Sequence, residues 1–307
     1  MIHPSGLPSR DKFCRLFHCK CLQKVKKIYV AKQPGFDELE GTYFDIGNMK
    51  IFRHDIDIYT TKGQLLLKFR KKVLTQSEVE KLNSLRAVTK TNRRYSAAGM
   101  PKMNREIVWI TSRHGKKYKV PIGGNTVRSS ILGFTDNLSN FASNRVVNKD
   151  GYKPRCRQTA FTGNNLSKYR NCISVFRRIS SLYKKLVPNY WAYQKSKIDE
   201  IADEYKIPRT IFTTVTVNKN FRTALHTDSG DLEKSMGNLV VTGHGFEGGE
   251  TLFPAFGVGV CVEPGDFFLM NVHEMHCNAP IEYIEEDGER LSFVFYLKKK
   301  VLNQCAI

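Results

Sequence analysis

The stretch TALHTDSGD, residues 223–231, places a histidine and an aspartate two positions apart in a region rich in β-branched residues. In an extended chain, residues i and i+2 point to the same face, so His226 and Asp228 can converge on one atom. A third ligand must come from elsewhere, and the stretch NVHEMHCNAP offers His273 and His276. Two histidines and one carboxylate on one face of a metal leave three adjacent positions open, which is the arrangement of non-haem Fe(II) oxygenases.

The strand-like stretch RLSFVFYL, near the C-terminus, alternates in character from one residue to the next. Alternation assigns a pocket face to Arg290, Ser292, Val294 and Tyr296 and a core face to Leu291, Phe293, Phe295 and Leu297. An arginine that points inward is very costly to bury unless it meets an anion. A dicarboxylate cosubstrate supplies that anion and can bind the guanidinium through two parallel hydrogen bonds. We therefore expect Arg290, with Ser292 beside it, to anchor such a cosubstrate.

Two other groups of potential ligands are weaker candidates. The run His54-Asp55-Ile56-Asp57 has an apolar residue two positions after its histidine and no downstream partner. Cys14, His18, Cys19 and Cys21 lie close together, but C-x-C spacing without a second pair makes a poor tetrahedral zinc site. The eight cysteines show neither a dense framework nor repeated C-x-x-C spacing, so we expect them to be reduced thiols.

Helical periodicity marks three segments that could support such a site. Residues 166–186 carry apolar side chains at helical spacing with lysine and arginine between them, and Pro188 is expected to end this amphipathic helix. A second helix is expected over residues 196–205. A shorter helix is expected over residues 77–85, with Ser77 as its cap.

Strand periodicity dominates after Pro208, where short β-branched or aromatic pieces alternate with Gly, Pro, Asn and Asp. Closely spaced short strands predict a barrel or sandwich. Earlier in the chain, residues 51–73 read as a hairpin around Gly63, whereas residues 92–163 predict loops and irregular strands. With helices packed outside one sheet, the fold class is α+β.

Charge and hydropathy narrow the class of partner. The net charge is +20, and residues 1–200 carry 40 Lys and Arg against 14 Asp and Glu, whereas residues 201–307 carry 9 against 15. A strongly positive field over the first two thirds favours a polyanion such as nucleic acid as the partner.

The apolar share of 41% indicates a globular protein with a real core. The longest apolar run, residues 252–262, is too short for a membrane helix, and the N-terminus has no apolar signal-peptide core, so we expect no membrane and an intracellular protein.

The order of these motifs resembles one enzyme family. H-x-D, a histidine about fifty residues later and R-x-S fourteen residues after it are similar to the Fe(II)/2-oxoglutarate dioxygenases of the ten-eleven translocation and J-binding-protein type (TET/JBP), which oxidise the 5-methyl group of pyrimidines in DNA. The resemblance covers roughly residues 50 to 300. Its matching stretches are FTTVTVNKNFRTALHTDSGD, GNLVV, GGETLFP, EPGDFFLMNVHEMHCNAP and ERLSFVFY, with looser similarity in KFRKKV, NRRYSAAG, LGFTDN and CRQTAFT.

This resemblance implies a double-stranded β-helix, or jelly-roll, core at about residues 208–300. That core would lie within a dioxygenase domain of residues 46–303, after a basic and loosely ordered segment of residues 1–45. The implied ligands of Fe(II) are His226, Asp228 and His276, since His276 fits the family form H-x-x-x-P and His273 does not. Arg290 and Ser292 are implied to bind 2-oxoglutarate, and O2 is the remaining cosubstrate.

The resemblance also implies four residues that meet a flipped base. A polar residue three positions after the iron aspartate meets the base, and Asp231 stands there. A carboxylate suits the amino group of a cytosine. Tyr296 matches an aromatic residue that stacks on the base, and Lys298 stands where several relatives carry a histidine that contacts it. Asn137, in the short match LGFTDN, is a further candidate.

The expected function is therefore oxidation of 5-methylcytosine in duplex DNA to 5-hydroxymethylcytosine or beyond, with the base flipped out of the helix. The same chemistry on thymine in DNA, or on RNA or protein, is an alternative. A non-catalytic DNA-binding module with a degenerate oxygenase fold is an alternative of another class, although binding alone needs neither the metal ligands nor Arg290. We expect a monomer, located in the nucleus if the source is eukaryotic.

Overall fold

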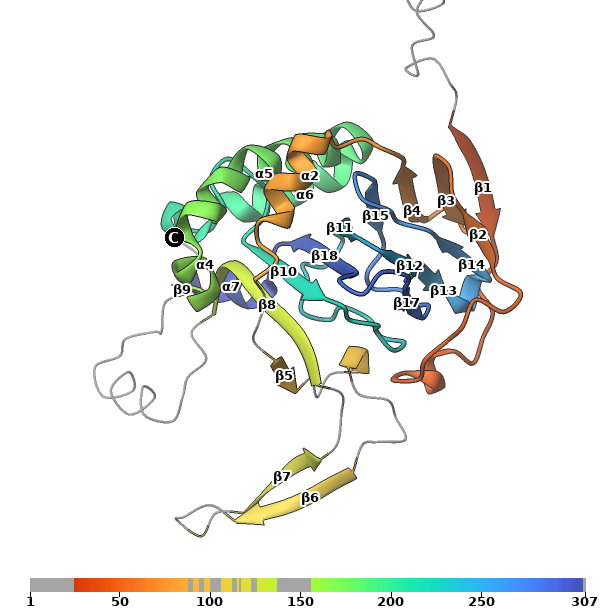
Figure 1. Ribbon diagram of the computed structural model, residues 1–307, viewed down its shortest axis with the longest axis horizontal. Helices are drawn as coiled ribbons and strands as arrows, with labels where there is room; N and C mark the ends of the chain where they lie inside the picture. Colours follow the sequence, from red (N-terminus) through yellow and green to blue (C-terminus); the bar gives the residue numbers. More distant parts are fainter. Residues whose placement is uncertain are drawn as a thin grey trace, which may run out of the picture.

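The structure is a computed structural model that describes residues 25–87, 91–93, 97–99, 106–111, 115, 117–122, 126–136 and 156–305 of the 307. Figure 1 shows helices gathered over one side of a broad, curved sheet, with shorter strands on the other side. The mixed α+β class expected from the sequence is therefore confirmed. In the described part of the chain, no helix is both long and apolar enough to cross a membrane.

The main sheet has ten strands and runs through the whole fold in the order β1-β3-β4-β15-β11-β18-β10-β8-β5, with β9 paired to β8. Its strands are β1 (Lys26–Val30), β3 (Ile56–Thr60), β4 (Leu65–Arg70), β5 (Thr91–Arg93), β8 (Thr126–Thr135), β9 (Arg157–Gln158), β10 (Thr214–Lys219), β11 (Gly237–His244), β15 (Phe267–Met270) and β18 (Glu289–Tyr296). Every pairing is antiparallel except β1 with β3. Strand β18 lies between β11 and β10 in this order, so it is hydrogen-bonded to a neighbouring strand along both edges.

A smaller sheet has the order β16-β13-β14-β2. Its strands are β2 (Lys50–Phe52), β13 (Thr251–Phe253), β14 (Val258–Val260) and β16 (Cys277–Asn278). A buried apolar cluster joins the two sheets, with Phe253 and Val260 from the smaller sheet and Leu66, Leu239 and Phe268 from the larger one. Two shorter pairs complete the strands, β6 (Glu106–Thr111) with β7 (Lys117–Ile122) and β12 (Phe246–Gly248) with β17 (Ile281–Tyr283).

The opposite face of the main sheet is covered by α2 (Gln76–Asn83), α5 (Leu166–Leu186) and α6 (Pro188–Asp199) (Figure 1). The amphipathic helix predicted for residues 166–186 is confirmed with the same bounds. Its apolar stripe buries Phe176 and Ile179 in a cluster with Phe293 and Phe295 of β18. Burial of such side chains stabilises a fold by roughly 1.5–3 kcal/mol each, so this helix anchors the strand that carries Arg290.

Helix ends differ from the sequence predictions. Thr75, rather than Ser77, caps α2, because its hydroxyl accepts from the Glu78 amide while the Glu78 carboxylate accepts from the Thr75 amide. Pro188 follows α5 but also begins α6, since proline has no amide hydrogen to lose at the first helical position. The second helix was therefore predicted too late, at residues 196–205, where the chain instead leaves α6 and makes a 3-10 turn.

The expected strands after Pro208 and the hairpin at residues 51–73 are both present, the latter as β3 and β4. The N-terminal segment differs from its prediction, because Lys26–Val30 forms a strand rather than a loosely ordered stretch. β8 is also regular over ten residues, inside the region predicted as loops and irregular strands. Both strands are held by pairing with distant strands, which local composition does not reveal.

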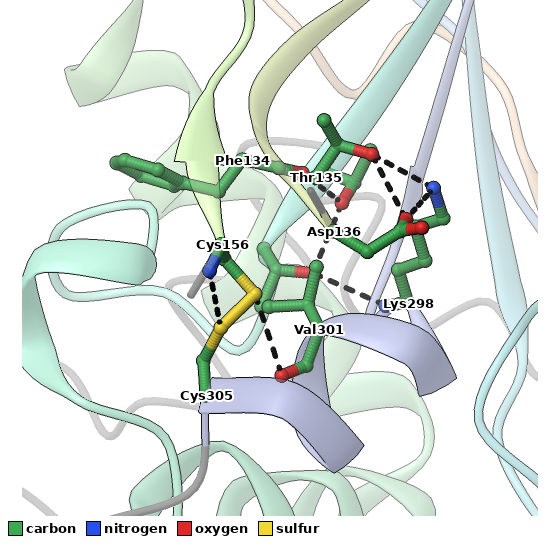
Figure 2. Close-up of a disulfide and its surroundings, with 9 residues drawn as sticks. Phe134, Thr135, Asp136, Cys156, Lys298, Val301 and Cys305 are labelled. Carbon is green, nitrogen blue, oxygen red and sulfur yellow. Dashed lines mark hydrogen bonds and ion pairs between the residues drawn. A yellow bond between two sulfur atoms is a disulfide. The ribbon is translucent and has the colours of Figure 1, made fainter. Parts of the chain in front are cut away.

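The cysteine prediction is wrong for one pair. Cys156 and Cys305 form a disulfide, shown in Figure 2, that links residues 149 positions apart in sequence. It ties the chain just before β9 to the end of α7 (Lys299–Cys305), the helix that follows β18. Cys172, Cys261 and Cys277 are buried free thiols. Cys14, Cys19 and Cys21, the weak zinc candidates, lie outside the described residues.

Replacing Cys305 with serine is expected to lower the free energy of unfolding by about 2–4 kcal/mol, because the link restricts a long loop of the unfolded chain. Chemical denaturation under non-reducing conditions measures this loss. A reductant should destabilise the wild type by a similar amount and leave the Cys305→Ser variant unchanged. Equal unfolding midpoints for oxidised and reduced wild type would show that the link does not stabilise the fold.

Candidate metal and cosubstrate site

His226, Asp228 and His276 meet at the centre of the fold. The amide of each histidine donates to the carbonyl of the other, both at 3.0 Å, so the two residues are cross-strand neighbours. The Nε2 atoms of His226 and His276 lie 3.6 and 3.7 Å from the two carboxylate oxygens of Asp228. One potential ligand atom from each residue lies within 4.8 Å of the others. The three side chains can therefore share one metal ion.

Backbone carbonyls fix the orientation of both imidazole rings. The Nδ1 atom of His226 lies 2.7 Å from the Ala224 carbonyl, and that of His276 lies 2.9 Å from the Glu274 carbonyl. A carbonyl only accepts, so each Nδ1 carries a hydrogen, and in the neutral ring Nε2 is then the nitrogen that can bind a metal. Outer hydrogen bonds of this kind orient metal-binding histidines and select their tautomer.

The electrostatics of the site also favour metal binding. Burial, together with the neighbouring His226, lowers the pKa of His276 to about 4. The imidazole is then neutral at ordinary pH, which is the form that binds a metal. The Asp228 side chain is 30% exposed, whereas those of His226 and His276 are 11% and 5% exposed, so the site opens on the aspartate side.

The other histidine of NVHEMHCNAP lies elsewhere. The Nε2 atom of His273 lies 3.2 Å from the Leu232 carbonyl, and its amide donates to Asn271. The structure thus brings His276, and not His273, to Asp228. In the rejected run at residues 54–57, Asp57 is buried in ion pairs with Lys68 and Arg70.

Arg290 is buried and, among the described residues, forms no ion pair with a carboxylate. It is 2% exposed, its Nη2 atom donates to the Gly249 carbonyl at 3.1 Å, and among the described residues its Nε atom has no hydrogen-bond partner. Burial lowers the pKa of Arg290 to about 10. A buried guanidinium with an unused donor is costly to the fold unless an anion completes it. The expectation that Arg290 points inward is therefore met by the geometry.

Gly249 makes room for this arginine. Its φ is +68°, a conformation that side chains other than glycine rarely adopt, and a Cβ there would lie 2.9 Å from Arg290 Nε. The guanidinium therefore lies against bare backbone. Phe246 covers it from another side, with 5.9 Å between the Arg290 Cζ atom and the ring centroid.

A single cavity of about 530 Å³ contains both groups. Its wall includes His226, Asp228, His276 and the whole predicted pocket face of β18, which is Arg290, Ser292, Val294 and Tyr296. The opposite set of β18, Leu291, Phe293 and Phe295, together with Leu297 just beyond it, is fully buried in the core. The alternation inferred for this strand is confirmed.

The same cavity continues past the triad to Asp231, Tyr296 and Lys298. Asp231 is 5% exposed and faces Lys298 across a β-bridge. Burial raises the pKa of Asp231 well above its ordinary value, and the charge of Asp228 raises it further. The Tyr296 hydroxyl lies 3.2 Å from the Thr216 hydroxyl. Asn137 lies outside the described residues.

Two polar residues of the cavity were not identified from the sequence. Within the described part of the chain, the Asn218 Oδ1 and Thr251 Oγ1 atoms are buried and have no hydrogen-bond partner. Buried polar atoms of this kind point to a ligand that would satisfy them. For Asn218 a signal existed, because alternation along TVTVNK places Thr214, Thr216 and Asn218 on one face.

Residues 147–299 match a family model, Tet_JBP, described as the oxygenase domain of the 2OGFeDO superfamily. This part of the chain belongs to the TET/JBP family. The double-stranded β-helix expected from the sequence is the fold of these oxygenases, and here it is formed by the two facing sheets with helices on the outer face of the larger one.

Several TET/JBP relatives are thymine dioxygenases by name. Thymine dioxygenase JBP1-A of Trypanosoma cruzi is 33% identical over 175 residues, which is 56% of this chain and 21% of that protein. Thymine dioxygenase JBP1 of Trypanosoma brucei brucei is 28% identical over 201 residues, or 65% of this chain and 24% of that protein. The chain therefore spans about a quarter of these relatives or less.

A solved TET/JBP structure has the same fold. NgTET1 in complex with 5mC DNA superimposes with a TM-score of 0.58 at 15% identity, covering 95% of this chain and 89% of that one. The resemblance to the TET/JBP family predicts that His226, Asp228 and His276 bind iron and that Arg290 and Ser292 bind 2-oxoglutarate. The structure brings these five residues to one cavity, and their roles as ligands stay predictions.

Proposed function

We propose that this chain is an Fe(II)/2-oxoglutarate-dependent dioxygenase that oxidises the 5-methyl group of a pyrimidine in DNA. The observation that carries the proposal is the content of one cavity: a facial group of two histidines and a carboxylate, and a buried arginine whose Nε atom has no partner among the described residues. A binding protein needs neither feature, which argues against the non-catalytic alternative.

The residues present fit the implied groups. Two imidazoles and a carboxylate suit Fe(II), and they leave open positions for a chelating keto acid and O2. When bound, iron and 2-oxoglutarate supply the oxidising chemistry. In this proposal the Arg290 guanidinium binds the distal carboxylate of 2-oxoglutarate, where its unused Nε hydrogen gains an acceptor. Ser292, two positions along the same face of β18, donates a further hydrogen bond.

The chain also has to admit a base. A methyl group in a stacked duplex cannot reach a buried metal, so the base is extruded into the cavity. In the proposal, Tyr296 stacks on it, and Asp231 and Lys298 meet its polar edge. The excess of Lys and Arg in residues 1–200 provides the contacts to phosphate that offset the cost of extrusion.

Two bases carry the required methyl group, and each has an argument in its favour. An Asp231 carboxylate suits the amino group of 5-methylcytosine. Thymine is the base in the names of the relatives that share about a third of their residues with this chain in the matched region. RNA or a protein side chain as substrate of the same chemistry remains the competing proposal.

Mass spectrometry of nucleosides tests the function. Duplexes containing thymine or 5-methylcytosine are incubated with the protein, Fe(II) and 2-oxoglutarate. We expect the 5-hydroxymethyl derivative of one or both bases, and no product when iron is chelated or 2-oxoglutarate is omitted. Turnover of 2-oxoglutarate that duplex DNA does not stimulate would instead favour a substrate other than DNA.

A further inference from the structure

The inward-facing row of β18 continues, two residues past the end of the strand, to Lys298, whose ammonium group is held in place by other residues. Arg290 begins this row and Lys298 lies eight residues further on, roughly 26 Å along an extended strand. Both line the cavity. The cavity therefore has a guanidinium at its cosubstrate end and an ammonium at the end assigned to the base.

Two side chains from β8 and the residue after it hold that ammonium. The Lys298 Nζ atom lies 2.5 Å from Asp136 Oδ1 and 2.8 Å from Thr135 Oγ1, and the Thr135 hydroxyl donates to the same Asp136 oxygen at 3.1 Å (Figure 2). Asp136 is 2% exposed. Burial acts to raise the pKa of Asp136, but its hydrogen bond with Lys298 and the charge of Lys298 outweigh this, so that pKa lies below its ordinary value.

The backbone around this network is also fixed. The Lys298 amide donates to the Thr213 hydroxyl at 3.1 Å, and the Phe134 amide donates to the Thr213 carbonyl at 2.9 Å. At Gly133 a Cβ would lie 2.4 Å from that carbonyl, so only glycine allows β8 to approach this closely. Helix α7, which follows Lys298 directly, is tied back by the disulfide at Cys305 (Figure 2).

We propose that Asp136 and Thr135 are positioning residues that fix the Lys298 ammonium at one place on the rim of the base, and that this fixed donor sets the preference between thymine and 5-methylcytosine. The proposal rests on the proposed function. Asp136 does not line the cavity and acts only through Lys298.

The chemistry of the two bases explains why the position of one donor matters. At positions 3 and 4, thymine presents a donor and then an acceptor, whereas 5-methylcytosine presents an acceptor and then a donor. The cavity wall offers the donor Lys298 and the Asp231 carboxyl group, which lie on two backbone segments paired by a β-bridge. A lysine has only donors, whereas a carboxylate accepts. With Lys298 at position 4 and Asp231 at position 3, the two side chains match thymine, and with these positions exchanged they match 5-methylcytosine. A lysine that was free to move could bind either base in its matching arrangement. Lys298 has two of its three N–H groups directed at Asp136 and Thr135, so its ammonium is held at one position and matches only one of the two bases.

Base preference measured on paired substrates tests this. The ratio of kcat/KM for duplexes that differ only in thymine or 5-methylcytosine at one site is compared for the wild type, Asp136→Asn, Thr135→Val and Lys298→Met. We expect the wild type to prefer one base by about tenfold or more, the scale that a hydrogen bond to a charged group supports. Asp136→Asn and Lys298→Met are expected to remove most of that preference, and Thr135→Val part of it. The KM for 2-oxoglutarate should not change.

The controls separate positioning from general damage. Lys300→Met removes an exposed lysine two residues further on and should keep the wild-type ratio. Lys298→Arg keeps a donor and should retain more of the preference than Lys298→Met. An unchanged ratio in Asp136→Asn, or no preference in the wild type, overturns the proposal. Equal losses on both bases with a smaller salt dependence would overturn it too, because Lys298 would then be a phosphate contact.

A binding measurement keeps this inference distinct from the proposed function. With Mn(II) in place of iron, and without O2, the affinity is measured for duplexes whose thymine or 5-methylcytosine lies opposite an abasic site, where extrusion is easy. If neither base is oxidised but binding still discriminates and loses discrimination in Asp136→Asn, the proposed reaction fails and the positioning role stands. If binding does not discriminate, the positioning role fails whatever the turnover.

Discussion

Replacing Asp228 with alanine is expected to abolish oxidation of DNA and turnover of 2-oxoglutarate. The two imidazoles would remain, but the ion would lose its one anionic ligand at the centre of the group. Loss of an outer hydrogen-bond partner of a ligand costs roughly 10–100-fold in metal affinity or activity, and loss of the ligand itself should cost more. Calorimetry with Mn(II) and an assay of 2-oxoglutarate turnover measure the two effects, and His226→Ala and His276→Ala should behave in the same way.

The chain offers a matched control for this experiment. His244, Glu285 and Asp287 form a second group of two carboxylates and a histidine with ligand atoms within 4.8 Å, but all three residues are exposed. His244→Ala should therefore leave turnover unchanged. Salt-sensitive association with DNA should survive in the Asp228 variant, since phosphate contacts do not involve the metal. Normal turnover in both Asp228→Ala and His226→Ala would refute the proposed metal centre.

Replacing Arg290 with methionine is expected to raise the KM for 2-oxoglutarate by roughly 30-fold or more. Truncation of one partner in a buried, hydrogen-bonded charge pair costs about 2–5 kcal/mol, and every 1.4 kcal/mol is a factor of ten. Affinity for Mn(II) in the absence of 2-oxoglutarate should change little, because Arg290 is not part of the metal group. Steady-state kinetics at varied 2-oxoglutarate concentration measure the shift.

Arg86 provides the control for Arg290. It is 59% exposed and pairs at 3.4 Å with Glu289, the neighbour of Arg290 on β18, so Arg86→Met removes a nearby guanidinium without opening the cavity. The KM of that variant should match the wild type. An unchanged KM in Arg290→Met would mean that the anion binds elsewhere, and the unpartnered Nε atom would need another explanation.

Several parts of the site could be predicted from the sequence because they depend on local periodicity. Alternation along β18 places Arg290 and Leu291 on opposite faces of the strand. A shift of register by one residue would turn every core side chain toward the cavity, so a strand with one core face and one cavity face allows only one register. The helix at residues 166–186 is equally local, since its apolar spacing matches 3.6 residues per turn over its whole length. The i, i+2 spacing of His226 and Asp228 likewise let a shared ligand position be inferred.

Other parts depend on contacts that local spacing does not encode. The pairing of His226 with His276 comes from reciprocal backbone hydrogen bonds between distant segments. The disulfide between Cys156 and Cys305 was not predicted from the cysteine spacing, because the two residues lie 149 positions apart and no motif links them. The strand at Lys26–Val30 was missed for the same reason, since β3 supplies its hydrogen bonds.

The sequence by itself determined the type of chemistry: which side chains could bind a metal, which arginine would face inward, and which strand would carry it. Only the tertiary structure showed what surrounds those groups, with His276 paired to His226 across the backbone, Gly249 against Arg290, and Asp136 on Lys298. Side-chain facing repeats every two residues along a strand and is written locally, whereas the partner across a cavity depends on which distant strands pair and in what register.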